Sequence, residues 1–208
     1  MFRSDLPVVF VTLLSLLGCS KSTPPEPEIY QIEDSFEDGI SSWTVHSLDD
    51  EVDTLTIDWY FLSSDERASK GSQSAKLYMD NLTDAAKIWL GRSLEVTPDK
   101  TYSVTISFDL ASADHGEVNV FSILANALPQ EPTTRDDILS GVLEGDFPEG
   151  TYNGGIEDFV WLYKSLTKNV RTTGEGKLFF ILGIWGTWEG ARTYYFDDLR
   201  ITVTEQPQ

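Results

Sequence analysis

The feature that most limits what this chain can fold into is a two-residue alternation of apolar and polar side chains. It is clearest in residues 101–110, where Tyr102, Val104, Ile106, Phe108 and Leu110 alternate with threonine, serine and aspartate. Successive side chains of a β-strand point to opposite faces, so this pattern predicts a strand with one buried and one solvated face. Similar patterns occupy residues 74–79, 86–96, 117–124, 159–166, 177–185 and 194–203.

Clusters of turn-forming residues separate these segments, at residues 69–72, 97–100, 174–176 and 186–190. Short strands joined by such turns are typical of antiparallel sheets. No long stretch has the 3.6-residue apolar period of a helix, and only residues 136–143 predict a short one. Roughly nine or ten strands predict an all-β fold, an antiparallel β-sandwich of either the jelly-roll or the immunoglobulin type.

A chain of 208 residues accommodates one such domain. Residues 129–158 interrupt the pattern, because they are rich in proline, glycine and acids and contain few apolar side chains. Loops of this length inside a compact domain are usually functional or disordered. We therefore expect a single domain over residues 29–204 that carries a long loop at about 129–158.

The first 28 residues indicate an export signal and a tether. Arg3 precedes an apolar run that ends at Leu17, which is too short to span a bilayer and matches the core of a signal peptide. Its end, Leu16-Leu17-Gly18-Cys19, resembles the lipobox of bacterial lipoproteins, in which the peptide is cut before the cysteine and the cysteine is acylated. The resemblance implies a signal peptide at 1–18, lipidation at Cys19 and a proline-rich tether at 19–28. An ordinary secretory signal with a chance cysteine is the alternative.

The balance of charge restricts the partners of the chain. The sequence holds 34 acidic and 15 basic residues, which gives a net charge of −19. Nucleic acid binding requires lysine and arginine to displace counterions from phosphates, so this charge argues against a nucleic acid partner. Cys19 is the only cysteine, so the exported domain has no disulfide to stabilise it. We expect a lipoprotein whose acyl chains anchor it at the outer membrane or cell surface.

The last predicted strand places one carboxylate in an unusual position. Leu199, Ile201 and Val203 share one parity and are expected to face the core, and Asp197 has the same parity. A buried carboxylate is costly unless it is paired or binds a metal ion. Calcium takes oxygen ligands and would offset that cost, while a salt bridge at the rim of the sandwich is the alternative.

The ends of the domain resemble a known family. The segments 35–39 (SFEDG), 68–75 (ASKGSQSA) and 195–199 (YFDDL), together with Trp43 and the strand that begins at Tyr102, look like galactose-binding-like jelly rolls. Within them, the carbohydrate-binding modules of the xylan- and glucan-binding type are the most similar. The resemblance implies the jelly-roll type of sandwich and places Trp43 in its core.

The same resemblance implies a structural calcium ion beside the first and last strands. Carried over residue by residue, its ligands are Ser35, Gly71 and Asp197. The long insertion at 129–158 departs from the compact modules of this type, so their binding cleft is not transferred directly.

Aromatic side chains are the candidates for ligand binding, because the C–H face of a sugar ring stacks on an aromatic ring. Trp89 has the parity opposite to its apolar neighbours Ile88 and Leu90, which predicts a polar face for it unless the long loop covers it. Trp161 and Tyr163 share one face of their strand, and Trp188 lies in a glycine-flanked turn. For each of these four residues, packing in the core or at the end of the sandwich is the alternative.

No catalytic motif is present. The two histidines lie far apart, and neither a nucleophile elbow nor a zinc-protease motif occurs. The sequence therefore predicts a non-catalytic domain that binds a polysaccharide or glycan and is anchored to a membrane by its lipid. A structural or adhesion module that binds protein or cell wall is the first alternative. A glycan-active enzyme, which needs two carboxylates facing one cleft, is the weaker one.

Overall fold

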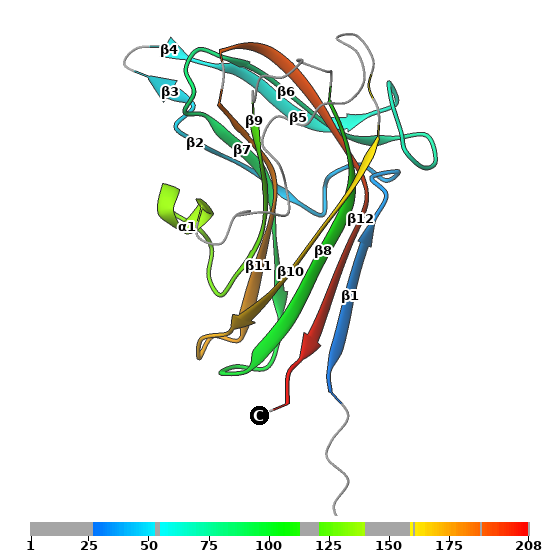
Figure 1. Cartoon of the computed structure of the whole chain (residues 1–208), viewed down its shortest axis with the longest axis vertical. Coiled ribbons are helices and arrows are strands. Elements are labelled where there is room, and N and C mark those ends of the chain that lie inside the picture. Colours follow the sequence, from blue (N-terminus) through cyan, green and yellow to red (C-terminus); the bar gives the residue numbers. More distant parts are fainter. Residues whose placement is uncertain are drawn as a thin grey trace, which may run out of the picture.

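In the computed structural model, the chain forms two antiparallel β-sheets that pack face to face (Figure 1). The structure describes residues 27–52, 55–112, 121–139, 159, 161–187 and 189–207. The fold is the predicted all-β sandwich of the jelly-roll type. The predicted signal peptide, Cys19, Trp188 and the segment 140–158 lie outside the described residues.

Six strands form the first sheet, which we call sheet A. They are β1 (Ile29–Asp34), β5 (Asp58–Ser64), β6 (Ser74–Asn81), β8 (Thr101–Ser112), β10 (Leu162–Arg171) and β12 (Gly190–Glu205). The order is β10-β8-β12-β6-β5, and β1 pairs with the second half of β12. The first and last strands are therefore neighbours, as the resemblance implied.

Four strands form the second sheet, sheet B, in the order β2-β7-β11-β9. They are β2 (Thr44–Leu48), β7 (Lys87–Glu95), β9 (Phe121–Leu128) and β11 (Lys177–Gly186). A small hairpin of β3 (Glu51–Val52) and β4 (Leu55–Thr56) stands apart from both sheets. The helix α1 (Arg135–Leu139) falls in the segment where a short helix was predicted, and Figure 1 shows it on the outer side of sheet B.

The core lies between the two sheets and is rich in aromatic side chains. The ring of Phe196 in β12 packs against those of Phe61 in β5 and Phe108 in β8, with centroids 5.9 Å apart in both cases. Phe121 of sheet B packs edge-on against Tyr194 of sheet A at 4.9 Å. Trp43 is buried in this core, which confirms its predicted place.

A β-bulge changes the direction of side chains along β12. Phe196 pairs with Leu110 and Asp197 with Asp109, but the register shifts between Asp197 and Arg200. Asp198 takes a left-handed backbone conformation with φ of 46°. The bulge adds one residue, so Asp197 lies on the outer face of sheet A while the residues after it return to the core. The predicted inward direction of Asp197 is therefore wrong, because it assumed an unbroken alternation.

Within these described ranges, no helix is long and apolar enough to cross a membrane.

Candidate functional site

A pocket of about 200 Å³ opens on the outer face of sheet B. Strands β2 and β7 supply most of its wall, since His46 pairs with Trp89 and Thr44 pairs with Gly91 across the two strands. Phe179 of β11 and Glu131 of the segment before α1 complete it. Its lining consists of Thr44, His46, Gly91, Arg92, Ser93, Glu131 and Phe179. We call this cavity the sheet B pocket.

The imidazole of His46 is held between two residues of β7. It stacks on the ring of Trp89, and it occupies the space that a side chain at Gly91 would fill. It stacks on the indole of Trp89 with centroids 5.3 Å apart and planes at 9°. The imidazole also lies close to the backbone of Gly91, where an added Cβ would be 2.7 Å from the His46 Nε2 atom. Both strands are paired here, so the ring of His46 has little room to change its orientation.

Trp89 does not itself face solvent. It is 4% exposed and forms a small apolar cluster with Leu124, Ile181 and Ile138 of α1. The prediction of an open, polar face at Trp89 is corrected by this packing, because α1 and its flanking segment cover the strand. Cover by the long loop, which was the alternative prediction for Trp89, is what α1 provides. The indole of Trp89 stacks beside the imidazole of His46, on the same face of sheet B.

The sheet B pocket combines groups that recognise hydroxyl-rich molecules. The hydroxyls of Thr44 and Ser93 donate and accept hydrogen bonds, and the carboxylate of Glu131 accepts. Arg92 has the opposite parity to Ser93 in β7, and its guanidinium lies 5.6 Å from the ring centroid of the core residue Trp43. Polar groups placed around a partly aromatic wall are typical of small-ligand sites.

None of the residues that line the sheet B pocket was predicted from the sequence, and His46 shows why. A lone histidine three residues after a core tryptophan carries no motif, and its pairing with Trp89 is a long-range contact. The alternation in β2 could have indicated that His46 faces away from Val45, but not what lies opposite.

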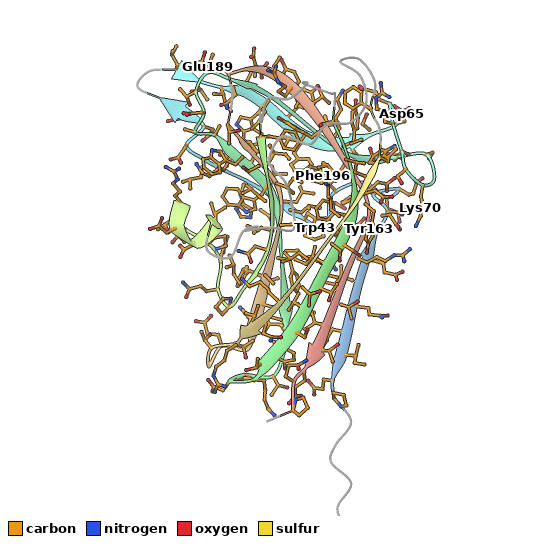
Figure 2. All side chains as sticks on the ribbon, viewed as in Figure 1. Trp43, Asp65, Lys70, Tyr163, Glu189 and Phe196 are labelled. Atoms are coloured by element: carbon orange, nitrogen blue, oxygen red, sulfur yellow. The ribbon has the colours of Figure 1, made fainter. Side chains whose placement is uncertain are left out.

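Two other predicted ligand-binding residues lie on the opposite side of the sandwich. Tyr163, in β10, is 68% exposed, and Figure 2 shows it on the strand that runs across the front of the molecule. Trp161 lies on the same face and packs edge-on against Tyr195 of β12 at 6.5 Å. Trp161 and Tyr163 share the outer face of sheet A, as their parity predicted. The core of the sandwich separates them from Trp89, which is in sheet B.

A larger cavity of about 520 Å³ lies between the β6–β7 connection and the turn between β11 and β12. Its described lining is Thr83, Asp84, Thr187 and Glu189, and Figure 2 shows Glu189 at one end of the sandwich. Trp188 stands between two of these residues in the sequence but lies outside the described residues. The described part of this cavity has no aromatic wall, so it lacks the surface on which a sugar ring stacks.

The three predicted calcium ligands lie around the segment that joins β5 to β6. Ser35 is exposed in the turn after β1, and Gly71 has a φ of +68°. A Cβ at Gly71 would lie 2.3 Å from the carboxylate of Glu37. That carboxylate accepts backbone hydrogen bonds from Ser72 and Gln73 at 2.7 and 2.8 Å. These bonds lower the pKa of Glu37 and fasten one end of the segment to the turn after β1.

Asp197 attaches the other part of the β5–β6 segment, at Ser69 and Lys70, to β12. Its side chain is fully buried, and its Oδ2 atom accepts backbone hydrogen bonds from Ser69 and Lys70 at 2.7 and 2.9 Å. Its Oδ1 atom accepts one from Asp198 at 2.7 Å. Burial raises the pKa of Asp197, with a smaller contribution from Asp109, and the three backbone bonds act against that rise. In the described part of the chain, no three histidine, cysteine or acidic side chains are grouped so as to hold a metal ion.

No family model matches the chain, and no curated protein matches it in sequence. Solved structures do resemble its fold. The CBM22-1 xylan-binding domain of Xyn10C from Paenibacillus barcinonensis is 16% identical, with a TM-score of 0.46, over 89% of this chain and 100% of that one. The C-terminal family 22 carbohydrate-binding module of Xyn10B from Clostridium thermocellum is 16% identical, with a TM-score of 0.42, over 83% and 91%.

A cleaved adhesin domain of Lys-gingipain from Porphyromonas gingivalis is 14% identical, with a TM-score of 0.50, over 83% of this chain and 97% of that domain. At this level of identity the likeness concerns the fold alone. The chain thus shares the β-sandwich fold of this adhesin domain.

Proposed function

We propose that this protein binds carbohydrate without modifying it, and that the sheet B pocket is its principal site. The observation that supports the proposal most directly is the fixed imidazole of His46, stacked on Trp89 at the wall of a pocket with mixed polar and aromatic lining. A sugar presents hydroxyl groups at its rim and C–H bonds on its faces, and this lining offers partners for both.

Each part of the pocket has a separate task in this proposal. The rings of His46 and Phe179 contact the C–H faces of the sugar. The hydroxyls of Thr44 and Ser93 donate hydrogen bonds to its hydroxyl oxygens, and Glu131 accepts hydrogen bonds from its hydroxyl groups. Because Trp89 and Gly91 fix the imidazole before the ligand arrives, little conformational entropy is lost on binding.

Binding to a glycan array or retardation in affinity electrophoresis tests the proposal. The protein should be retarded by at least one neutral polysaccharide, and a His46→Ala variant should lose most of that retardation. A control variant at an exposed apolar position away from the pocket, Leu55→Ala, should behave like the parent. Failure of the parent protein to bind any glycan would contradict the proposal and favour a protein-binding module.

The second part of the proposal is a structural calcium ion held near Ser35, Gly71 and Asp197. The donor atoms of this region fit calcium in kind, because the carboxylates of Asp197 and Asp109 and the backbone around Gly71 supply oxygen ligands. A cation here would also balance the two neighbouring carboxylates of Asp109 and Asp197, which pair directly across β8 and β12. The ion would hold the β5–β6 segment against the terminal strands, where the backbone bonds to Asp197 already attach it.

The third part concerns location. Lipidation at Cys19 would place the domain at the outer membrane or cell surface, on a short proline-rich tether. Metabolic labelling with a fatty acid tests this: the label should enter the parent protein and not a Cys19→Ala variant. Incorporation into neither, together with release of the protein in soluble form, would indicate an ordinary secretory signal.

A further inference from the structure

The outer face of sheet A carries a row of aromatic side chains that the sheet B pocket does not use. We call it the aromatic strip. Strand pairing places its residues on one face, since Lys76 lies opposite Tyr195 and Tyr78 opposite Tyr60 across β5, β6 and β12. Tyr163 lies at the β10 edge of the same face, opposite Asp109 of β8. The strip consists of Tyr60, Lys76, Tyr78, Phe159, Trp161, Tyr163 and Tyr195.

The middle of the strip is rigid. Glu66 accepts hydrogen bonds from the Lys76 Nζ atom at 2.5 Å and from the Tyr195 hydroxyl at 2.8 Å. The same Nζ atom lies 5.8 Å from the ring centroid of Tyr60 and 6.0 Å from that of Tyr195. Lys76 is only 9% exposed. A buried cation that is paired with a carboxylate and enclosed by two rings fixes both rings in one orientation.

Further contacts fix the two ends of the strip. The guanidinium of Arg67 lies 4.2 Å from the ring centroid of Phe159, which in turn packs edge-on against Tyr195 at 5.5 Å. At the other end, Tyr60 and Tyr78 stack with centroids 5.1 Å apart. The rings of Tyr60, Tyr78, Phe159 and Tyr195 are thus preorganised, and they do not pay the entropy of ordering when a ligand binds.

The middle of the strip is covered, since Tyr195 is 3% exposed. The two edges of this face leave apolar surface open. Tyr163 is 68% exposed, Tyr60 38% and Leu62, which follows Tyr60 on the same face of β5, 41%. These are three of the six large apolar side chains that are exposed in the described part of the chain. They lie on β10 and β5, the two edges of the five-strand path, which span about 19 Å at the usual strand spacing. That length suits a chain of several sugar rings better than a single one.

The charges on this face decide which kind of chain fits. The two cations that lie over rings of the strip are already engaged, Lys76 with Glu66 and Arg67 with Phe159 and Tyr195. Arg200, on the same face, pairs with Asp198. Asp58 and Asp80 pair across β5 and β6 and add negative charge beside Tyr78. The chain as a whole carries a net charge of −19. A polyanion would be repelled by this surface, whereas a neutral polymer with C–H faces and hydroxyl groups matches rings flanked by carboxylates.

We propose that the aromatic strip is a second carbohydrate site, which binds a neutral polysaccharide on the face of the sandwich opposite to the sheet B pocket. The inference rests on the proposed function, because it assigns the same class of ligand to a second surface. Two sites on opposite faces would allow one domain to bridge two glycan chains, or to bind one polymer at two places with increased avidity.

Isothermal titration of the full chain with xylohexaose and cellohexaose tests the second site, with hexagalacturonate as the anionic probe. The parent protein should bind a neutral probe at two sites and should not bind the anionic one. Replacing both exposed rings, Tyr60→Ala with Tyr163→Ala, should weaken one site by at least about tenfold and leave the other. Tyr163→Phe keeps the ring and should retain binding, and Leu55→Ala is the control for an exposed apolar side chain elsewhere.

The outcomes separate this inference from the proposed function. One site that His46→Ala abolishes and the tyrosine variants leave unchanged would overturn the second site and keep the sheet B pocket. One site that only the tyrosine variants weaken would support the strip and remove the pocket. Preference for hexagalacturonate would overturn the neutral ligand class. Absence of binding to all three probes would overturn the inference together with the pocket.

Discussion

The imidazole of His46 lies almost parallel to the indole of Trp89, with ring centroids 5.3 Å apart. One ring lines the sheet B pocket and the other is buried beneath α1, so the pair connects the open surface to a packed apolar cluster. A polar ring on a rigid support of this kind presents the same geometry to every ligand that enters. The orientation of His46 should therefore be as important for binding as its presence.

A Gly91→Ala variant tests that orientation. Its new Cβ would lie 2.7 Å from the His46 Nε2 atom, so the imidazole must move while every hydrogen-bonding group of the pocket remains. We expect glycan affinity to fall by roughly tenfold and stability by about 1–2 kcal/mol, as for other overpacked sites. Titration and urea denaturation measure the two effects.

Gly174→Ala is the matched control, because a Cβ there meets nothing within 4 Å. It should leave both affinity and stability close to those of the parent. Equal affinity of the two alanine variants for the glycan would show that the position of His46 does not matter.

Replacement of Asp197 by alanine should lower the free energy of unfolding much more than replacement of Asp198. Asp197→Ala leaves the partly buried backbone N–H groups of Ser69 and Lys70 without their acceptor, which costs about 2–4 kcal/mol of unfolding free energy. Asp198 is partly exposed and binds Lys70 and Arg200 at the surface, so Asp198→Ala should cost about 1 kcal/mol, mainly from its left-handed backbone. Thermal and urea denaturation of both variants measure this order, and the reverse order would contradict the assignment of Asp197 as the anchor of the β5–β6 segment.

Calcium should stabilise the parent protein and not the Asp197→Ala variant. An ion that binds only the folded state raises the melting temperature as its concentration increases. The comparison is a thermal melt in excess EDTA and in millimolar Ca²⁺, with Mg²⁺ as the control ion. An identical melting temperature in EDTA and calcium would show that backbone bonds alone hold this region.

A Tyr194→Phe variant should lose less stability than the parent protein when the pH is raised above 10. Burial raises the pKa of Tyr194 well above its usual value of 10, and its hydroxyl has no hydrogen-bond partner among the described residues. Above pH 10 the unfolded chain therefore loses this proton while the folded chain keeps it, so stability falls as the pH rises. The variant removes that loss and should be within about 1 kcal/mol of the parent at pH 7.

Urea denaturation at pH 7 and pH 10.5 measures the difference. Tyr30, whose pKa its hydrogen bond with Glu28 raises to about 12, acts in the same direction and remains in the variant. The fall with pH should therefore become smaller without disappearing. An unchanged fall would mean that Tyr194 does not stay protonated in the folded state.

The alternation of residues was sufficient to predict the class of fold. Tyr102, Val104, Ile106, Phe108 and Leu110 face the core from β8, as their parity predicted. Trp161 and Tyr163 share one face, which their parity also predicted. Two details could not be read from the sequence. Nothing in the pair Asp197-Asp198 marks the bulge that turns the first carboxylate outward, and no local pattern shows that α1 covers Trp89. Both depend on contacts between segments far apart in the chain.

Trp161 and Tyr163 of the strip were candidates from the sequence, but His46 and Tyr195 of the two proposed binding surfaces were missed for the same reason. His46 acquires its importance only through Trp89 and Gly91 on the neighbouring strand. Tyr195 acquires its importance through Lys76 and Glu66, more than 100 residues earlier. The consecutive aromatic residues before Asp197 do indicate that one ring faces outward, and this signal would have placed Tyr195 on the strip.

The most direct test of the account is the affinity of the protein for neutral polysaccharides, compared between the parent chain and His46→Ala. Affinity electrophoresis in gels with soluble xylan or β-glucan provides the measurement, and circular dichroism confirms that the variant is folded. The account predicts clear retardation of the parent and retardation of the folded variant that is reduced by at least about tenfold in affinity. Equal retardation of the two proteins would contradict the sheet B pocket as the principal site, and no retardation of either would contradict carbohydrate binding itself.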